Sequence, residues 1–199
     1  MTRGPSILRP GGDRSEIVPG ARILGIGVFL ASISMLFLAV IVAYVVVRHK
    51  APNWPPLDAP ALPKVLWLST LSLIGVSVFL HRALATVRRG VAKALMPQVG
   101  FAAFFATIFL LSQGAAWLYF MQNDTTFERH LFAFTFYMLT GLHGLHILGG
   151  MIGFVVLFVR VWQGEFSWAN TGSLRYHAIY WDYLLVVWVV LYGILLLDR

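Results

Sequence analysis

Cysteine is absent from the 199 residues of this chain, and charged residues make up only 12% of it. Without thiols the chain has no disulfide, no iron–sulfur cluster, no thiolate zinc site and no cysteine nucleophile. Any metal would need histidine, carboxylate or methionine ligands. The scarcity of charge argues against a soluble globular domain, in which about a quarter of the residues are charged. The sequence instead favours a protein whose solvent is the lipid bilayer.

Apolar side chains are abundant and account for 59% of the residues. They gather in five long runs, at approximately residues 22–47, 64–84, 97–121, 131–161 and 176–197. A helix needs roughly 20 mostly apolar residues to cross a bilayer, whereas barrel strands would alternate over about ten residues. We therefore predict an all-α, polytopic membrane bundle with five transmembrane helices in residues 21–199. A disordered or surface-lying tail, residues 1–20, precedes it.

The lysines and arginines lie between the apolar runs and do not form one basic face, so no nucleic-acid partner is expected. Their distribution predicts orientation, because cytoplasmic loops are enriched in Lys and Arg. With a cytoplasmic N-terminus, the inner set is Arg3, Arg9, Arg14, Arg22, Arg82, Arg88, Arg89, Lys93, Arg160 and Arg175, and the outer set is Arg48, Lys50, Lys64, Arg129 and Arg199. The larger inner set favours a cytoplasmic N-terminus and an external C-terminus.

Two histidines, His143 and His146, lie in the middle of the fourth run. They are three residues apart and share one helix face, and polar groups at this depth should face protein. Two roles are open to them, as haem or metal ligands or as hydrogen-bonding groups between helices. Ligation would need further ligands from other helices, and Asp182 is the only carboxylate within a run. We favour the structural role.

The fourth run also predicts an interface helix, because small residues let helix backbones approach closely in a membrane. Its glycines are Gly141, Gly144, Gly149, Gly150 and Gly153. In the fifth run Asp182 must be protonated, hydrogen-bonded to Tyr or His, or hydrated at the edge. A proton relay would need further groups deeper in that run, which has none. Gln113 and Thr140 are expected to hydrogen-bond between helices.

One segment resembles a known family. Thr140-Gly141-Leu142-His143-Gly144-Leu145-His146, followed by Gly150, is similar to the most recognisable segment of cytochrome c oxidase subunit III, the accessory membrane subunit of haem–copper terminal oxidases. Weaker similarity follows the same order along the chain, in Leu30 to Met35, Trp54-Pro55-Pro56, Leu68 to Leu71, Gln113 with Trp117, Tyr180-Trp181, and Val186-Val187-Trp188. The resemblance covers about residues 25–197, and the shorter bacterial members of that family also have five helices.

The chain departs from the family at several ionisable positions. The family usually has glutamates where this chain has Ile33 and Ala116, and a histidine and an aspartate where it has Asp182 and Leu185. The family's first-helix glutamate supports proton uptake by the catalytic subunit, and that role does not transfer to Ile33. The resemblance therefore indicates a divergent member.

The resemblance implies a non-catalytic subunit of an aerobic respiratory oxidase, fed by cytochrome c or quinol, in a bacterial inner (plasma) membrane with the C-terminus in the periplasm. Its expected partners are the catalytic subunit I, subunit II and membrane phospholipids, the last held in a cleft between the first two helices and the other three. Haem and copper are expected in the partner subunits, and no cofactor or catalytic centre in this chain. The expected structural or interface residues are Thr140, Gly141, His143, Gly144, His146, Gly150, Gln113, Trp181, Asp182 and Trp188.

Three other functions compete with this one. The accessory subunit of a nitric oxide reductase has the same helical core, and nothing in the residues alone separates it from the oxidase subunit. A small membrane transporter would be expected to have discontinuous helices and a paired charge near the midplane. A di-haem cytochrome would need histidine pairs on two facing helices, whereas the other four histidines, His49, His81, His130 and His177, lie near the ends of the runs.

Overall fold

The computed structural model describes residues 19–51, 54, 61–90, 94–123, 131–164, 166 and 171–197, with the side chains of residues 19–22 left out. Five α-helices make up almost all of this part of the chain. They are α1 (Pro19–Lys50), α2 (Val65–Arg88), α3 (Leu95–Gln122), α4 (Leu131–Trp162) and α5 (Gly172–Leu197). All five are long and apolar enough to cross a membrane, so the prediction of a five-helix multi-pass protein is confirmed.

The helices extend beyond the apolar segments from which they were predicted. α5 begins at Gly172, four residues before the predicted run, and α1 extends to Lys50. The reason is that hydropathy marks the part of a helix within hydrocarbon, while its hydrogen bonding continues into the polar headgroup layer. The predicted tail lies almost entirely outside the described residues.

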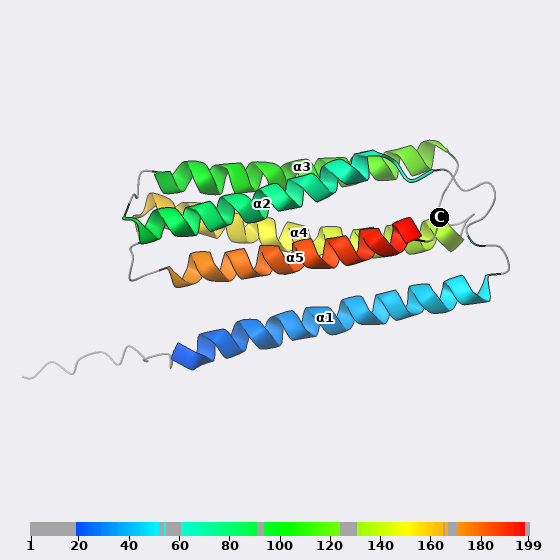
Figure 1. The fold of residues 1–199 in the computed structure, drawn as a ribbon, viewed down its shortest axis with the longest axis horizontal. Helices are drawn as coiled ribbons and strands as arrows, with labels where there is room; N and C mark the ends of the chain where they lie inside the picture. The colour runs from blue at the N-terminus through cyan, green and yellow to red at the C-terminus, as the bar shows by residue number, and fades with distance from the viewer. Residues whose placement is uncertain are drawn as a thin grey trace, which may run out of the picture.

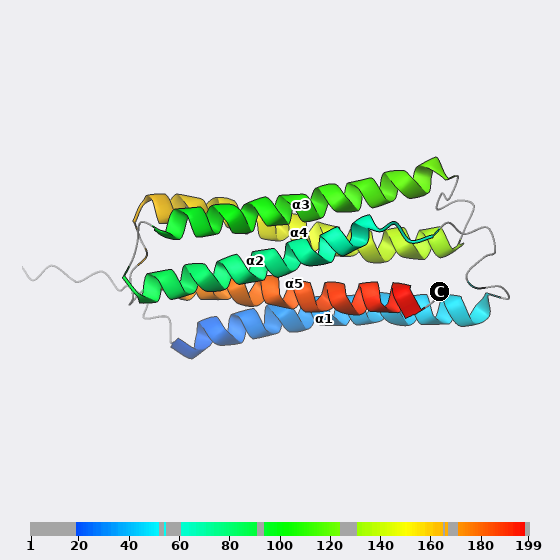
Figure 2. The same ribbon diagram turned by 45° about the horizontal axis from the view of Figure 1, so that its top comes forward.

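Four of the helices form a closed bundle, and the fifth flanks it. The backbone of α2 lies beside α3 and α5, and α4 lies beside the same two helices, so α2, α3, α4 and α5 close a ring (Figure 1). Within the described residues α1 approaches only α4 and α5. Figure 2 shows the same arrangement from another side, with α1 along the outer edge of α5. The bundle therefore buries its own core, and α1 is an addition to it.

This arrangement corrects the expected lipid cleft. The resemblance implied a division between the first two helices and the other three, but α1 and α2 do not pack together in the described structure. α2 instead makes the most extensive contact of the molecule, with α3. Gly75 of α2 allows this approach, because a Cβ added there would lie 2.8 Å from the ring of Phe105 on α3. Two grooves do lie beside α1, and both of them face α5.

α2 and α4 end in the same way and at the same end of the bundle. Gly90 follows α2 with φ +73°, and Gly164 follows α4 with φ +70°. Their backbone N–H groups donate to the carbonyls of Val87 and Val161, at 3.0 and 3.1 Å. A left-handed glycine is a common helix stop. Here it fixes the place where α2 presents Arg88 and Arg89.

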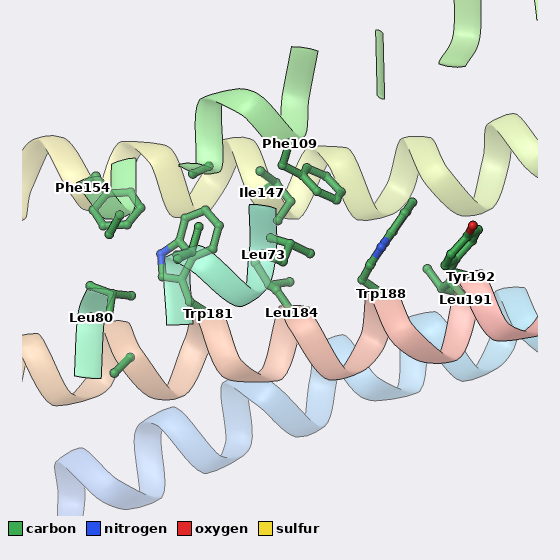
Figure 3. Close-up of a cluster of buried hydrophobic side chains, with 14 of the residues drawn as sticks. Leu73, Leu80, Phe109, Ile147, Phe154, Trp181, Leu184, Trp188, Leu191 and Tyr192 are labelled. Carbon is green, nitrogen blue, oxygen red and sulfur yellow. The ribbon is translucent and has the colours of Figure 1, made fainter. Parts of the chain in front are cut away.

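Two tryptophans of α5 fill the bundle core. Trp181 and Trp188 extend from α5 toward α4, with Phe154, Ile147 and Phe109 around them (Figure 3). Trp181 lies 5.0 Å from Phe154 between ring centroids, and Trp188 lies 5.1 Å from Phe109. Both are almost fully buried. In a bilayer such packing, rather than exclusion of water, holds helices together.

Candidate functional site

The central residue of the predicted interface helix is His143, which is fully buried where four helices meet. Its ring is surrounded by aromatic side chains from three other helices. The centroid distances are 6.1 Å to Phe37 of α1, 5.4 Å to Phe109 of α3 and 5.4 Å to Trp188 of α5. His143 therefore acts as a flat packing element at the junction of the bundle with α1.

The hydrogen bonds expected of the histidine pair are only partly present. Neither ring nitrogen of His143 has a hydrogen-bond partner among the described residues. His146 uses Nδ1 within its own helix, 2.8 Å from the Leu142 carbonyl, and its ring lies 5.0 Å from Phe37. The link between helices comes from its backbone, because Tyr180 of α5 donates its hydroxyl to the His146 carbonyl at 2.8 Å.

Thr140 joins α3 to α4, as its predicted role requires. The indole N–H of Trp117 donates to Thr140 Oγ1 at 3.0 Å, and the threonine hydroxyl donates to the Phe136 carbonyl at 2.7 Å. The edge of the Trp117 ring lies 3.5 Å from the Cβ position of Gly141. The Thr140 hydroxyl thus binds the Trp117 indole, and the neighbouring Gly141 leaves room for its ring.

The glycines of α4 face two different surroundings. A Cβ on Gly150 would lie 2.7 Å from the Trp181 ring, and one on Gly153 would lie 2.7 Å from His177 Nε2, so these two admit α5 side chains. Gly144 has nothing within 4 Å of its Cβ position. α4 therefore serves both as an internal interface toward α5 and as an open surface at Gly144.

Gln113 belongs to a buried polar cluster between α2 and α3. Its amide N–H donates to Ser69 Oγ at 2.9 Å, and Ser69 Oγ lies 2.6 Å from Ser112 Oγ. Its carbonyl oxygen has no partner among the described residues. On the neighbouring face of α2, Thr70 accepts a hydrogen bond of 3.0 Å from the Trp188 indole. These bonds connect α2 to both of its neighbours, while the Trp181 indole nitrogen is buried without a described partner.

Asp182 of α5 has two partners, both on α2. Ser77 donates its hydroxyl to Asp182 Oδ1 at 2.6 Å, and His81 Nε2 lies 3.5 Å from Oδ2. His81 Nδ1 is 3.0 Å from the Ser77 carbonyl, which can only accept, so the two form a hydrogen bond in the tautomer that carries its proton on Nδ1. The Asp182 side chain is 38% exposed and opens onto a cavity between α2 and α5. The carboxylate is thus paired and also accessible.

The sequence pointed to Asp182 but not to Ser77 and His81. Ser77 and His81 are four residues apart on α2, a spacing that brings both to one helix face. That spacing was the one signal in the sequence that could have identified them. Nothing in the sequence of α2 or of α5 indicates that the face with Ser77 and His81 meets the face with Asp182. Across the described residues, no three histidine or carboxylate side chains gather in a way that could hold a metal ion.

The fold and this site define a multi-pass helical membrane protein whose polar groups connect its own helices. Comparison with known proteins narrows that class. The family model described as cytochrome c oxidase subunit III matches residues 10–197. The chain belongs to that family.

Individual relatives agree along nearly the whole chain. It is 32% identical over 176 residues to cytochrome c oxidase subunit 3 of Synechocystis sp., covering 87% of this chain and 74% of the relative. It is 27% identical to the Thermostichus vulcanus protein of the same name, covering 92% and 90%. A probable cytochrome c oxidase subunit 3 of Mycobacterium leprae is 28% identical, covering 88% and 87%. The family thus identifies an accessory subunit of a multi-subunit haem–copper oxidase.

Proposed function

We propose that this chain serves a bacterial terminal oxidase by packing α3 and α4 against the catalytic subunit I of that enzyme, in an assembly that also contains subunit II. The haem and copper of that enzyme would lie in the partner subunits. The proposal places the complex in the plasma membrane, with the N-terminus of this chain in the cytoplasm and its C-terminus in the periplasm. The names of the relatives favour an oxidase over a nitric oxide reductase.

The observation that carries the proposed contact is a groove of ≈ 270 Å³ between α3 and α4. Gly114 and Gly144 line it, and neither has an atom within 4 Å of its Cβ position. Leu145 and Leu148 border it and are 63% and 50% exposed. Small residues at an open helix surface let another helix approach closely. A transmembrane helix of the catalytic subunit is the occupant we propose.

We further propose that phospholipid acyl chains occupy the two grooves beside α1. One, of ≈ 290 Å³, lies between α1 and the α4 and α5 helices near Phe29 and Gly153. The other, of ≈ 300 Å³, lies between α1 and α5 near Phe37 and Val187. The exposed surface of both grooves is mainly apolar, which suits hydrocarbon. Lipid in these grooves would complete the packing of α1 and stabilise the assembly.

The test is a mild-detergent purification through a tag on this chain. We expect mass spectrometry to identify a haem–copper catalytic subunit in the purified material, with an oxidase-type reduced-minus-oxidised spectrum. Gly144→Leu should lower the recovered haem per tagged chain several-fold, because the larger side chain fills the groove. Gly27→Leu, at an equally open glycine of α1, is the matched control. A colourless protein without partners would contradict the proposal, and equal recovery from both variants would remove the α3–α4 contact from it.

A further inference from the structure

A cavity of ≈ 420 Å³ lies between α2 and α5, outside the grooves described above. Three arginines line it, Arg88 and Arg89 at the end of α2 and Arg175 in the first turn of α5. His81 and Asp182 line its inner end. The C-terminal end of α2 and the N-terminal end of α5 lie at the same end of the bundle (Figure 1). The cavity is therefore a basic recess at one membrane surface.

The two antiparallel helices build this recess with the same spacing. α2 contributes positions 81, 84, 85 and 88, and α5 contributes positions 175, 178, 179 and 182. Residues at i, i+3, i+4 and i+7 share one helix face. The middle of each face carries an alanine, Ala85 and Ala178, whose small side chains leave space between the helices. Apart from Arg89, which directly follows α2, the residues that line the cavity thus lie on regular helix faces.

The charges of the recess are unbalanced. Asp182 is already engaged by Ser77 and His81. Arg88, Arg89 and Arg175 make no ion pair within the described part of the chain. Three cations gathered between two apolar helices repel one another, and an anion between them would relieve that repulsion. Among the described residues that line the recess, Asp182 is therefore the one anion facing three arginines.

We propose that this recess binds a phosphate group, from the headgroup of an anionic phospholipid or from free phosphate. A guanidinium presents five N–H donors in a planar fork that matches phosphate oxygens, and arginine is favoured over lysine where such anions are recognised. Basic pockets between transmembrane helices on the cytoplasmic side commonly receive anionic lipid headgroups. The inference deepens the lipid-binding part of the proposed function by naming a headgroup class and a site.

The depth of the residues favours a lipid as the source of the phosphate. Arg175 is three residues from the start of α5 and Asp182 is ten. At about 1.5 Å per residue, Arg175 lies roughly 5 Å along the helix and Asp182 roughly 15 Å. α5 is about 39 Å long on the same scale, longer than a hydrocarbon layer of about 30 Å. With α5 centred in that layer, Arg175 lies at the edge of the hydrocarbon, within reach of the lipid phosphates, and Asp182 lies inside it.

The experiment measures lipid binding by the full chain in its purified complex. Native mass spectrometry would follow titration with phosphatidylglycerol or with phosphatidylcholine. We expect R88Q/R175Q to bind phosphatidylglycerol about 25-fold more weakly than the unaltered protein, at about a fivefold loss per arginine. Phosphatidylcholine binding should change by less than about twofold, since that headgroup carries no net charge.

Two further variants separate the proposal from general damage. R82Q removes another arginine of α2. Arg82 lies over the Phe79 ring, 5.7 Å from its centroid, and does not line the recess. This substitution should leave phosphatidylglycerol binding within about twofold. D182N removes the negative charge at the inner end and should tighten that binding about fivefold. Misfolding cannot produce a gain of affinity.

The outcomes distinguish the sources and decide the proposal. Isothermal titration of the complex with inorganic phosphate at constant ionic strength would identify free phosphate as the ligand if R88Q/R175Q abolishes the binding heat. Equal phosphatidylglycerol binding by the unaltered protein and R88Q/R175Q, without any phosphate heat, would overturn the site. So would an equal loss in R82Q. If R88Q/R175Q still recovers the catalytic subunit, the proposed function stands whatever the fate of this site.

Discussion

α1 is more apolar than α2 but less buried. The most apolar stretch of α1 has a mean hydropathy of 2.7 with 17% of it buried, whereas that of α2 has 1.5 with 39% buried. In a soluble protein the more apolar helix would be the more buried one. In a bilayer lipid tails are as apolar as leucine. Apolar character here indicates contact with lipid, and polar character indicates contact with protein.

The serines of the two helices show the cause of this difference. On α2, Ser69 accepts a hydrogen bond from Gln113 of α3, and Ser77 donates one to Asp182 of α5. On α1, Ser32 donates only to the Val28 carbonyl of its own helix, and Ser34 reaches another helix through the Tyr183 hydroxyl at 3.0 Å. Polar groups at membrane depth are costly unless they find partners. α2 holds such groups because its neighbours supply partners for them.

The largest effect that tests this comparison is the loss of a buried leucine from α2. Leu73 is 1% exposed, whereas Met35 of α1 is 74% exposed. Leu73→Ala should lower the free energy of unfolding by about 2–5 kcal/mol through lost packing and a cavity. Met35→Ala should cost less than about 0.5 kcal/mol, since lipid fills the space. Unfolding in mixed micelles measures both, and equal costs would break the comparison.

An intermediate effect is expected from adding one methyl group at a glycine. A Cβ on Gly150 would lie 2.7 Å from the Trp181 ring, while Gly27 of α1 has open space around it. Gly150→Ala should destabilise the protein by about 1–3 kcal/mol, because a buried indole cannot move aside. Gly27→Ala should be neutral or stabilise by up to about 1 kcal/mol. Melting temperatures in detergent would compare the two, and a neutral Gly150→Ala would contradict the tight α4–α5 contact.

The smallest effect concerns single hydroxyl groups. Ser69→Ala removes the acceptor of the Gln113 amide and should cost about 0.6 kcal/mol, the average for hydrogen bonds between membrane helices, and at most about 1.7 kcal/mol. Ser32→Ala removes a bond to the helix's own backbone and should cost almost nothing. The same micelle unfolding assay applies. A cost for Ser32→Ala as large as that for Ser69→Ala would contradict the comparison.

The sequence was sufficient to predict the five helices but not to predict which helices pack against one another. Five apolar runs indicated five crossings because hydropathy and length decide whether a segment can span a bilayer. Which faces meet depends on side chains that fit one another, and no single run carries that information. Thus Thr140 and Gln113 were correctly expected to bond between helices, while Trp117 and Ser69 became their partners only in the folded structure.

His143 and Asp182 illustrate the same limit. The structural role predicted for His143 assumed hydrogen bonds, yet its ring lies among Phe37, Phe109 and Trp188 without a described partner. The need of Asp182 for a partner followed from the cost of burying a carboxylate. That its histidine partner would be His81, at 3.5 Å, depended on the antiparallel packing of α2 and α5. Physical cost predicts that partners exist, and packing decides which they are.

The position of α1 has a consequence for synthesis. α1 ends at Lys50, and α4, the first of its two neighbours in chain order, begins at Leu131. About 80 residues separate them, which at roughly 5–20 residues per second corresponds to roughly 4–16 s of translation. During that interval α1 has no partner helix among the described helices already made, although its Tyr44 packs on the nearby Trp54. The mean hydropathy of 2.7 in its most apolar stretch makes α1 stable in the bilayer without a partner helix.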